Sequence, residues 1–468
     1  MGLSGEDQGQ VLEFIDTYKN LLAKIKTCSL PVNLKVSACN NLALGKILHH
    51  FYNTRLDCEQ LKDLDNSLKF QIKEIFHLYK STTNSVIFLS RDIGGLGVKK
   101  LSDVYISTRV SFLLKMLNHS VEQFKHIART SLALDMEKRG VLRTENERNF
   151  LGYELSENGF LRTRTKFGCA SDWIELSHYS RKLNVQVKFV NGEAVVYTGN
   201  AILSSANNLQ NKLFDLFTAK RIEKAKQLTL QGNYIKMNGI VSKTSHSIFY
   251  NWNVDDDLVK FCLSARLNIL PTNFIKHIWN NENNPECNFC SHATESMAHV
   301  LNSCKVFNNY YSRRHDRIVS KIFSFLEKLI DDDFVIYSEK MAETIFPEYD
   351  WHNIQHRKPD IVILNKVTKR IIVVEITVPY DLYFSWAKEA KVTRYSPYCR
   401  LLETFNYNTK FIVLCFGSLG TIDQDVRTGL MYFKPSNKNL KDLLKWCSIS
   451  VIIGSNYIWR SRVKKLLR

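Results

Sequence analysis

Apolar residues recur at helical spacing through much of the chain and predict a mainly α-helical N-terminal half. The stripe is clearest in residues 58–79, where Leu61, Leu64 and Leu68 lie on one helical face. The same spacing predicts helices in five further segments: residues 13–50, 102–119, 205–231, 310–329 and 256–280, the last of them broken at Pro271. Such a stripe is typical of a helix face that packs into a hydrophobic core.

An alternating pattern interrupts these helical segments between Asn184 and Tyr197. Polar and apolar residues alternate on both sides of Asn191 and Gly192, a dipeptide that favours a two-residue hairpin turn. We therefore expect a β-hairpin with one solvated face in a linker region.

The C-terminal part carries the pattern of a small mixed sheet flanked by helices, which is an α/β arrangement. Residues 361–364 and 370–378 are two apolar runs joined by a polar turn at residues 365–369, and they predict an antiparallel strand pair. A further strand is expected at residues 410–417, after a helix at residues 382–395.

Glu375 lies in the middle of the second apolar run, where a buried carboxylate is costly unless a cation or partner compensates it. Asp360 precedes the first run, so pairing of the two strands can set both carboxylates side by side. Two hard oxygen donors suit Mg2+ (or Mn2+), and we expect a nuclease site with both residues as metal ligands. The alternative is that Asp360 is a turn residue and Glu375 pairs with a nearby lysine or arginine.

A lysine is expected beside these carboxylates, to orient the attacking water and to offset charge on the phosphate. Residues two apart on a strand face the same way, and the position that shares a face with Glu375 is Thr377. The ammonium group must then come from elsewhere, and the helix predicted at residues 382–395 carries Lys388 and Lys391. We expect Lys391 to be the catalytic lysine, with Lys388 as the second candidate.

A second candidate metal site has the spacing Cys-x2-Cys-x8-His-x4-Cys. Its ligands would be Cys287, Cys290, His299 and Cys304. Three thiolates and one imidazole at this spacing predict a closed, tetrahedral Zn2+ site, which is structural or contacts nucleic acid because it has no open position for catalysis. His292 is an alternative ligand, and four unrelated residues in a reduced protein are the simpler alternative.

The charge of the chain favours a polyanionic partner. It has 64 basic and 46 acidic residues, a net charge of +18, although a solvated basic surface would give the same balance. The side chains expected to contact nucleic acid are Arg313, Arg314, Arg317, Lys358, Arg394 and Tyr395. A helix that packs its aromatic residues and exposes its arginines to water is an equally good interpretation.

Eleven cysteines and no signal peptide indicate a reducing compartment, and no apolar run reaches transmembrane length. We therefore expect a soluble protein that has no disulfides and does not enter membranes.

These motifs stand in an order that resembles the C-terminal part of a non-LTR retrotransposon polyprotein. The motifs that carry the resemblance are residues 266–272, the Cys-Cys-His-Cys knuckle, Arg314-His315-Asp316, Lys358-Pro359-Asp360 and residues 375–379. Upstream, residues 61–68 and 93–98 resemble the thumb region that follows a reverse-transcriptase palm. The branch is the one with a restriction-like endonuclease, whose members insert into ribosomal DNA or spliced-leader genes.

The resemblance implies a restriction-like, PD-(D/E)xK-like domain that nicks target DNA in the nucleus, so that the 3′ hydroxyl primes reverse transcription of element RNA. It implies that Asp360 and Glu375 are the metal-binding acids and that Lys391 is the family's lysine. It also implies five segments: a thumb-like helical region at 1–124, a linker at 125–255, a helical segment with the knuckle at 256–319, the endonuclease at 320–440 and a basic tail at 441–468.

Two features of the family are missing from the sequence. No pair of adjacent aspartates has the context of a polymerase palm, and no N-terminal zinc fingers or Myb-like segment are recognisable. Polymerase activity is therefore expected of a parent element and not of this chain, which resembles a fragment or a truncated copy. Two functions follow: an active metal-dependent DNA nickase, or alternatively a catalytically silent nucleic-acid-binding remnant or domesticated retroelement protein.

Overall fold

The chain forms two compact units in this computed structural model, which describes residues 5–137, 164–165, 168–169, 171–198, 201–204, 208–280, 284–291 and 293–467. The first unit comprises Met1–Ser90 and Gly95–Ala225, and the second comprises Arg91–Gly94 and Lys226–Arg468. The boundary after Ala225 lies inside the segment 125–255 that was expected as a linker.

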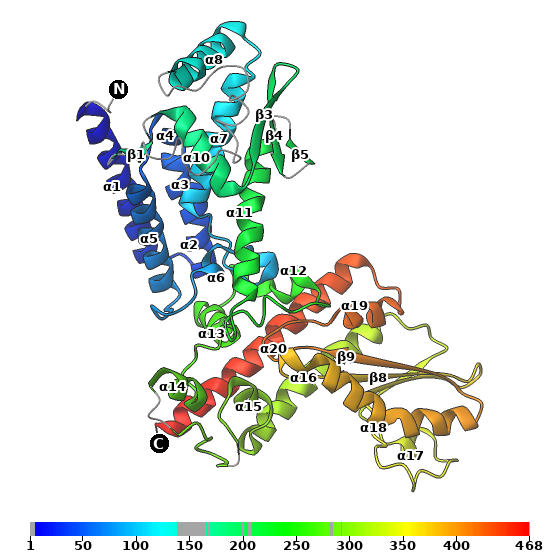
Figure 1. The fold of residues 1–468 in the computed structure, drawn as a ribbon. Helices are drawn as coiled ribbons and strands as arrows, with labels where there is room; N and C mark the ends of the chain where they lie inside the picture. The colour runs from blue at the N-terminus through cyan, green and yellow to red at the C-terminus, as the bar shows by residue number, and fades with distance from the viewer. Residues whose placement is uncertain are drawn as a thin grey trace. The chain divides into compact units, whose positions relative to one another are not determined.

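Helices make up most of the first unit (Figure 1). Its elements are α1 (Gly5–Thr27), α2 (Val32–Ala38), α3 (Leu44–Ile47), α4 (His50–Asn53), α5 (Cys58–Ile75), α6 (Ser85–Phe88), α7 (Leu101–Leu117), α8 (Glu122–Glu137), β1 (Arg164–Thr165), β2 (Gly168–Cys169), α10 (Asp172–Leu183) and α11 (Leu209–Lys226). The helix predicted from residue 58 is confirmed. It begins there because the Asp57 side chain accepts from the Gln60 backbone N–H in a capping box.

The single helix predicted for residues 13–50 is wrong, because the chain breaks at Pro31. Helix α1 ends at Thr27, and Pro31 is the N-cap of α2. A proline has no backbone N–H to donate to the preceding turn, so α1 cannot continue through it. After α2 the backbone widens into a π-helical turn at Cys39–Ala43.

The predicted hairpin is confirmed as β3 (Gln186–Val190) and β4 (Glu193–Thr198), which pair antiparallel. The turn between them has φ of 49° at Asn191 and 80° at Gly192. Positive φ at both turn positions is the type I′ geometry that Asn-Gly favours. A third strand, β5 (Ala201–Ser204), pairs with β4 and was not predicted.

The second unit surrounds a four-stranded mixed sheet with helices. Its helices are α12 (Ser242–Ser245), α13 (Asp256–Arg266), α14 (Asn273–Asn280), α15 (Met297–Asn302), α16 (Asn308–Leu326), α17 (Ala342–Ile345), α18 (Phe384–Thr404), α19 (Gln424–Met431) and α20 (Asn437–Leu466). The strands are β6 (Val335–Ser338), β7 (Ile361–Asn365), β8 (Arg370–Thr377) and β9 (Asn408–Cys415), paired in that order.

The strand pair predicted beside the two acidic residues is confirmed. Strands β7 and β8 run antiparallel, with Ile361 opposite Val374, and β9 runs parallel to β8 after α18. Strand β6 pairs antiparallel with β7 and was not predicted. Helix α18 is longer than predicted, since it continues through Pro397 to Thr404.

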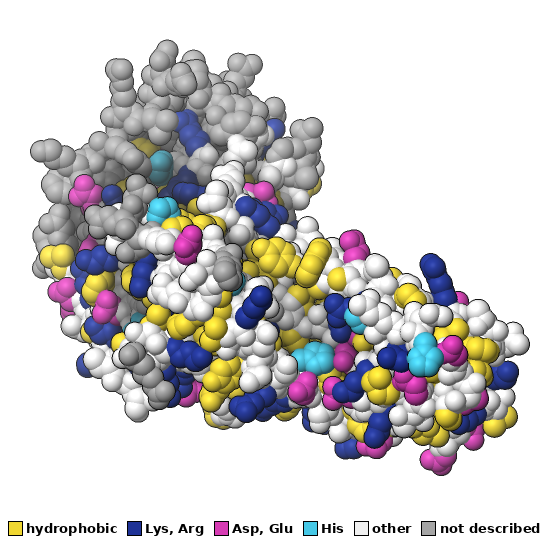
Figure 2. Space-filling view, turned by 90° about the horizontal axis from the view of Figure 1, so that it is seen from below, with side chains coloured by type: hydrophobic (Ala, Val, Ile, Leu, Met, Phe, Trp, Pro, Cys, Tyr) yellow, Lys and Arg dark blue, Asp and Glu magenta, His cyan; other side chains and the backbone are white. Residues whose placement is uncertain are grey.

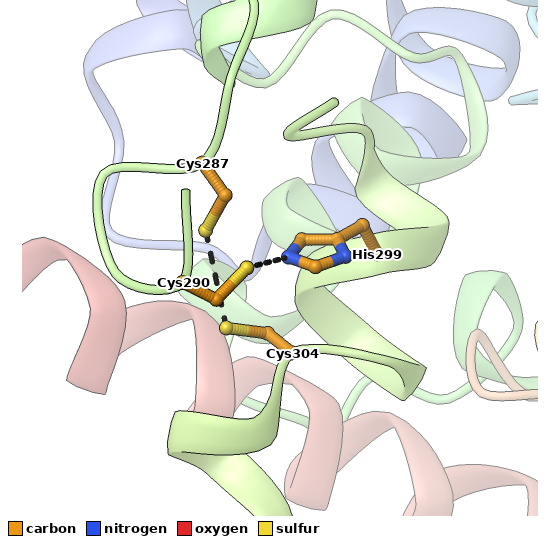
Figure 3. A group of neighbouring side chains, drawn as sticks. All are labelled: Cys287, Cys290, His299 and Cys304. Atoms are coloured by element: carbon orange, nitrogen blue, oxygen red, sulfur yellow. Dashed lines mark hydrogen bonds between the residues drawn. The ribbon is translucent and has the colours of Figure 1, made fainter. Parts of the chain in front are cut away.

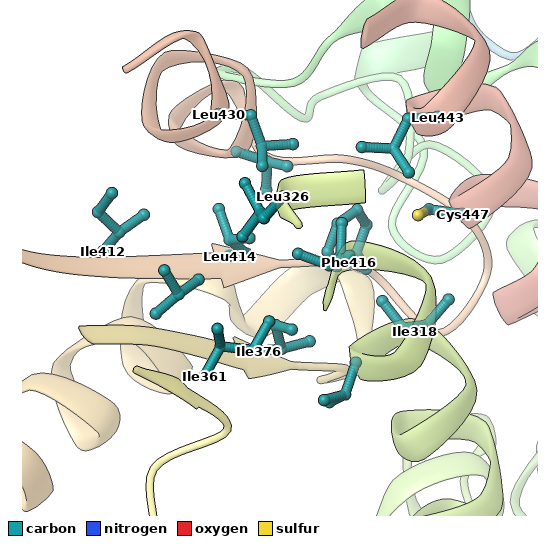
Figure 4. Close-up of a cluster of buried hydrophobic side chains, with 14 of the residues drawn as sticks. Ile318, Leu326, Ile361, Ile376, Ile412, Leu414, Phe416, Leu430, Leu443 and Cys447 are labelled. Carbon is teal, nitrogen blue, oxygen red and sulfur yellow. The ribbon is translucent and has the colours of Figure 1, made fainter. Parts of the chain in front are cut away.

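Hydrophobic clusters cover both faces of this sheet, because alternate strand residues face opposite sides. One cluster packs Ile361 and Ile376 against α16, α19 and α20 (Figure 4). The other packs Val362 and Val373 against residues of α17 and α18. Glu375 has the same parity as Val373, so its side chain belongs to the face covered by α18.

The segment 441–468, expected as a basic tail, lies almost entirely in α20, a helix of 30 residues. Its apolar residues Leu443, Cys447 and Val451 belong to the core cluster beside α16. Among the residues that the structure describes, no helix has both the length and the apolar content to cross a membrane. Figure 2 shows lysines and arginines spread over one face of the molecule, among acidic and apolar side chains.

Candidate functional site

The carboxylates of Asp360 and Glu375, here called the acid pair, lie next to each other at one end of the β7–β8 pair. The Asp360 backbone N–H donates to Glu375 Oε1 at 3.0 Å, and the Ile376 N–H donates to Asp360 Oδ2 at 2.7 Å. Both side chains are buried, Glu375 completely. The strand pairing predicted from the sequence is therefore what brings the two carboxylates together.

Lys391 joins the acid pair from α18. Its Nζ lies 2.6 Å from Glu375 Oε2 and 3.7 Å from Asp360 Oδ2. Lys388 lies one turn earlier on the same helix and pairs instead with Asp423, at 2.9 Å. Of the two candidate lysines, Lys391 is therefore the one that contacts the acid pair.

His315 also reaches the acid pair, from α16, although it was not predicted to lie at this site. Its Nε2 lies 3.4 Å from Asp360 Oδ2 and 3.1 Å from the Ile376 carbonyl oxygen. His315 is far from Asp360 in sequence, so the packing of α16 on the sheet creates the contact. The one signal for it in the sequence was its place between Arg314 and Asp316 in the family-like motif.

The ionisable groups of this site have opposite pKa shifts. Burial, followed by the charge of Asp360, raises the pKa of Glu375 to about 7. Burial also opposes ionisation of Asp360, but the His315 hydrogen bond and the Lys391 charge outweigh it and hold the Asp360 pKa below its usual value. For His315, burial lowers the pKa, while Asp360 raises it by hydrogen bonding and by charge, with a net rise to about 9. A charged Asp360 therefore stands beside a carboxyl group that ionises near neutral pH.

The acid pair offers hard oxygen ligands of the kind that divalent cations prefer. Among the described residues, one group brings three or more His, Cys, Asp or Glu ligand atoms close enough to share a metal ion, and it is the cysteine and histidine cluster described below. The acid pair alone supplies two ligands. Any cation there needs further oxygens from the backbone, water or a phosphate.

Two of the side chains expected to contact nucleic acid are buried. Arg314 is 5% exposed and its Nη1 donates to Ser455 Oγ at 2.8 Å. Tyr395 is also buried, and its hydroxyl donates to the Lys358 carbonyl oxygen at 3.0 Å. Both side chains are thus engaged inside the protein, because Arg314 joins α16 to α20 and Tyr395 packs in the core cluster beside Val373.

The other four expected side chains are exposed: Arg313, Arg317, Lys358 and Arg394. The Arg317 guanidinium lies over the Trp446 ring, 5.5 Å from its centroid. The four exposed side chains are free to reach a phosphate in solution. They lie on three segments of the second unit: α16, the loop before β7 and α18.

Cys287, Cys290, His299 and Cys304, here called the Cys3His cluster, come together in the second unit (Figure 3). Their ligand atoms all lie within 4.8 Å of one another, with 3.9 Å between the sulfurs of Cys287 and Cys304 and 3.4 Å between Cys290 Sγ and His299 Nε2. A tetrahedral zinc site with Zn–S bonds of about 2.3 Å holds its ligand atoms about 3.5–3.8 Å apart. The four expected ligands therefore fit Zn2+. The alternative ligand His292 lies outside the described residues.

Short local contacts build this cluster. The Cys287 N–H donates to the Ala293 carbonyl and the Ser291 N–H donates to the Cys287 carbonyl, both at 2.9 Å. Ser296 caps α15 by accepting from the His299 N–H at 3.1 Å, which fixes the helix turn that carries this imidazole. The turn positions the Cys287 thiol and the cap positions the His299 imidazole, so that both side chains point into the cluster.

The thiols of the cluster must lose their protons to bind a cation, and their pKa values show how strongly burial opposes this. Burial raises the pKa of the Cys304 thiol to about 12 and raises that of Cys287 as well. Burial lowers the pKa of His299, which keeps its imidazole in the neutral form that binds metals. Three neighbouring thiols in this setting favour a cation such as Zn2+, whose charge deprotonates its thiol ligands.

A buried ion pair ties α20 to the segment that carries this cluster. Arg462 Nε donates to Glu295 Oε1 at 2.9 Å, and the Asn273 N–H donates to Glu295 Oε2 at 2.8 Å. Arg462 is 2% exposed and Glu295 is fully buried. This arginine of the expected basic tail is thus a structural residue.

No protein-family model matches the chain. The chain is 22% identical over 376 residues to the retrovirus-related Pol polyprotein from type-1 retrotransposable element R2 of Popillia japonica. The aligned region covers 80% of this chain and 61% of the length of that polyprotein. Over most of its length the chain is therefore a distant homologue of the R2 non-LTR retrotransposon Pol polyprotein.

Proposed function

We propose that the second unit is a metal-dependent DNA endonuclease that nicks one strand of its target. The observation that carries the proposal is the convergence of Asp360, Glu375 and Lys391, with the lysine Nζ 2.6 Å from Glu375 Oε2 and 3.7 Å from Asp360 Oδ2. Two acids and a lysine on a small mixed sheet are the residue types and setting of a PD-(D/E)xK-like nuclease. The distant homology to the R2 polyprotein over 80% of the chain is consistent with this proposal.

In this proposal Asp360 and Glu375 hold Mg2+ (or Mn2+), which would lower the pKa of the attacking water and offset charge on the phosphate. Lys391 orients that water and stabilises the negative charge that builds on the phosphate oxygens. The water gives up a proton to solvent as its oxygen bonds to phosphorus, the bond from phosphorus to the 3′ oxygen breaks, and the 3′ oxygen takes up a proton, which leaves a 5′ phosphate and a 3′ hydroxyl. His315 holds Asp360 in place through its contact of 3.4 Å.

We also propose that the Cys3His cluster holds a structural Zn2+. The close approach of its four ligand atoms supports this role, and a closed four-ligand site leaves no position for catalysis. In a parent element the nick would expose a 3′ hydroxyl that primes reverse transcription of element RNA. This role would locate the protein in the nucleus, with target DNA as its partner.

A catalytically silent nucleic-acid-binding remnant, or a domesticated retroelement protein, is the second candidate function. It is favoured by the contacts that already surround the ligand oxygens: Lys391 pairs with Glu375 Oε2, and His315 contacts both Asp360 Oδ2 and the Ile376 carbonyl. A divalent cation would have to displace or share these contacts. The protein would then bind DNA without cleaving it.

The two candidates are separated by comparing DNA binding and cleavage in the wild type, Asp360→Asn and Glu375→Gln. A nuclease loses cleavage in both variants and keeps its affinity for DNA in a gel-shift assay, since each substitution removes a metal ligand while keeping the side-chain shape. Wild-type protein that binds DNA and does not cleave it with Mg2+ or Mn2+ identifies the silent remnant.

A further inference from the structure

A groove of about 310 Å3 opens next to the acid pair, between α15, the end of β8 and α18. Asn302 and Val378 both line it, and the Asn302 Nδ2 donates to the Val378 carbonyl oxygen at 2.6 Å. Asn302 is the last residue of α15, the helix that carries His299. This hydrogen bond therefore ties the segment of the Cys3His cluster to the residues that follow β8 at the groove.

The groove begins two strand residues beyond Glu375 of the acid pair. Thr377 lines it and faces the same side of β8 as Glu375, and two strand residues span about 6.6 Å. Lys391 belongs to both sites, because it lines the groove while its Nζ lies 2.6 Å from Glu375 Oε2. A chain whose phosphate lies at the acid pair would therefore have its neighbouring nucleotide at the groove.

Exposed aromatic rings and basic side chains line this groove together. Trp386 is 71% exposed and Tyr383 is 53% exposed, and both lie on the α18 side. Rings of this size usually keep much less of their surface in water. Arg394, exposed on the same helix, adds a second positive charge to that of Lys391. Aromatic faces with basic neighbours are the combination that holds single-stranded nucleic acid by base stacking and phosphate contact.

We propose that this groove, here called the side groove, holds one unpaired nucleotide of the DNA strand next to the phosphate that is cut. Its base stacks on Trp386 and Tyr383, and its phosphate faces Lys391 and Arg394. The volume is at the lower end of the range for small-molecule sites, which suits one nucleotide and excludes a stack of base pairs. The position of the cut phosphate rests on the proposed nuclease function, whereas binding of the unpaired nucleotide does not.

The test measures the affinity of the full chain for two DNA duplexes, in EDTA so that no cleavage occurs. One duplex is fully paired, and the other carries one unpaired 2-aminopurine, whose fluorescence reports stacking. Trp386→Ala should weaken binding of the second duplex by about 10-fold and abolish the fluorescence change, since stacking on one base is worth that much. Binding of the paired duplex should change less than 2-fold, and Trp386→Phe should restore the preference. Trp252→Ala is the matched control, because Trp252 is 57% exposed in the same unit and does not line the groove.

Equal loss of affinity for both duplexes in Trp386→Ala, or no loss for either, would overturn the proposal that the side groove binds an unpaired nucleotide. An RNA strand bound more tightly than DNA with the same dependence on Trp386 would overturn its assignment to the target DNA. A cleavage assay on the same preparations separates the two proposals. Cleavage without an effect of Trp386→Ala on binding would support the nuclease proposal and contradict the side-groove proposal. An effect of Trp386→Ala on binding without cleavage would support the side-groove proposal and contradict the nuclease proposal.

Discussion

A fully buried glutamate, Glu375, is the central residue of the proposed nuclease site. Burial and the charge of Asp360 raise the pKa of Glu375 to about 7, and the charge of Lys391 acts in the opposite direction. Lys391 therefore has two effects in this account: it keeps Glu375 able to ionise, and it is positioned to act on the water and the phosphate. Lys388 lies on the same helix but pairs with Asp423, so it provides a built-in comparison.

Replacing Lys391 by Met should lower the rate of DNA nicking by about 100-fold or more, because one preorganised cationic donor at a reacting phosphate contributes on that scale. The matched substitution Lys388→Met should leave the rate within about 3-fold. Both are measured by single-turnover nicking at saturating protein, so that a change in DNA affinity does not enter the rate. Equal losses in the two variants would contradict the assignment of Lys391.

His315 should make the stability of the second unit depend on pH. Its pKa rises from an ordinary 6.5 to about 9 in the folded protein, so the folded state binds an additional proton between these values. The contribution to the free energy of unfolding is therefore complete below pH 6.5 and is lost as pH rises through 9. With EDTA present, the unit should lose roughly 1–3 kcal/mol through His315 over this interval.

Urea unfolding at pH 6.5 and pH 9 checks this expectation. His315→Gln should flatten the difference between the two pH values, whereas His352→Gln, which changes an exposed histidine of the same unit, should preserve it. An unchanged pH dependence in His315→Gln would show that other groups cause it.

At the scale of elements, the sequence predicted the parts that depend on local pattern. The apolar runs of β7 and β8 and the turn between them set the antiparallel pairing, and this pairing alone brings Asp360 beside Glu375. The hairpin was predictable because Asn191 and Gly192 favour the type I′ turn. The four ligands of the Cys3His cluster were predictable from spacing, because two short loops and one helix turn bring them together.

What the sequence did not predict depends on packing between distant elements. His315 reaches Asp360 only because α16 packs on the sheet, and Arg314 beside it turns inward to Ser455. Strand β6 was missed because it has a half-exposed edge with no clear alternation. The basic residues at the end of α20 suggested a tail, although Arg462 among them is buried against Glu295.

The buried pair of Arg462 and Glu295 should be the contact of α20 most sensitive to mutation. Arg462→Ala leaves a buried carboxylate without its cation and should lower the free energy of unfolding by about 3–5 kcal/mol. Arg460 lies on the same helix as Arg462 and forms an exposed ion pair with Asp257 of α13. Arg460→Ala should lower the free energy of unfolding by less than about 1 kcal/mol. Urea unfolding measures both, and equal effects would mean that burial of the first pair does not decide its contribution.

Removal of zinc should unfold the segment that carries the Cys3His cluster. The purified chain should contain one equivalent of zinc by elemental analysis, and Cys304→Ser should reduce this severalfold. Cys58→Ser, which changes an exposed cysteine of the first unit, should keep the metal. Chelation should lower the Tm of the second unit by about 10 °C or more. A metal-free protein with an unchanged Tm would contradict a structural zinc site.

At the scale of the whole molecule, both candidate metal sites and the side groove belong to the second unit. In its described residues the first unit is a helical body with a two-stranded and a three-stranded sheet, and its thumb-like role stays a prediction. The excess of 18 positive charges suits a polyanionic partner for the chain as a whole. The distant homology to the R2 polyprotein spans both units, because it covers 80% of the chain.

Nicking of supercoiled plasmid is the direct test of the proposed nuclease. The wild-type chain should convert supercoiled DNA to the open-circular form with Mg2+ or Mn2+ and not with EDTA, and a DNA polymerase should extend the 3′ hydroxyl at the nick. Asp360→Asn should bind the plasmid and leave it supercoiled. Nicking that persists in Asp360→Asn, or wild-type protein that binds the plasmid and never nicks it with either metal, would contradict the account.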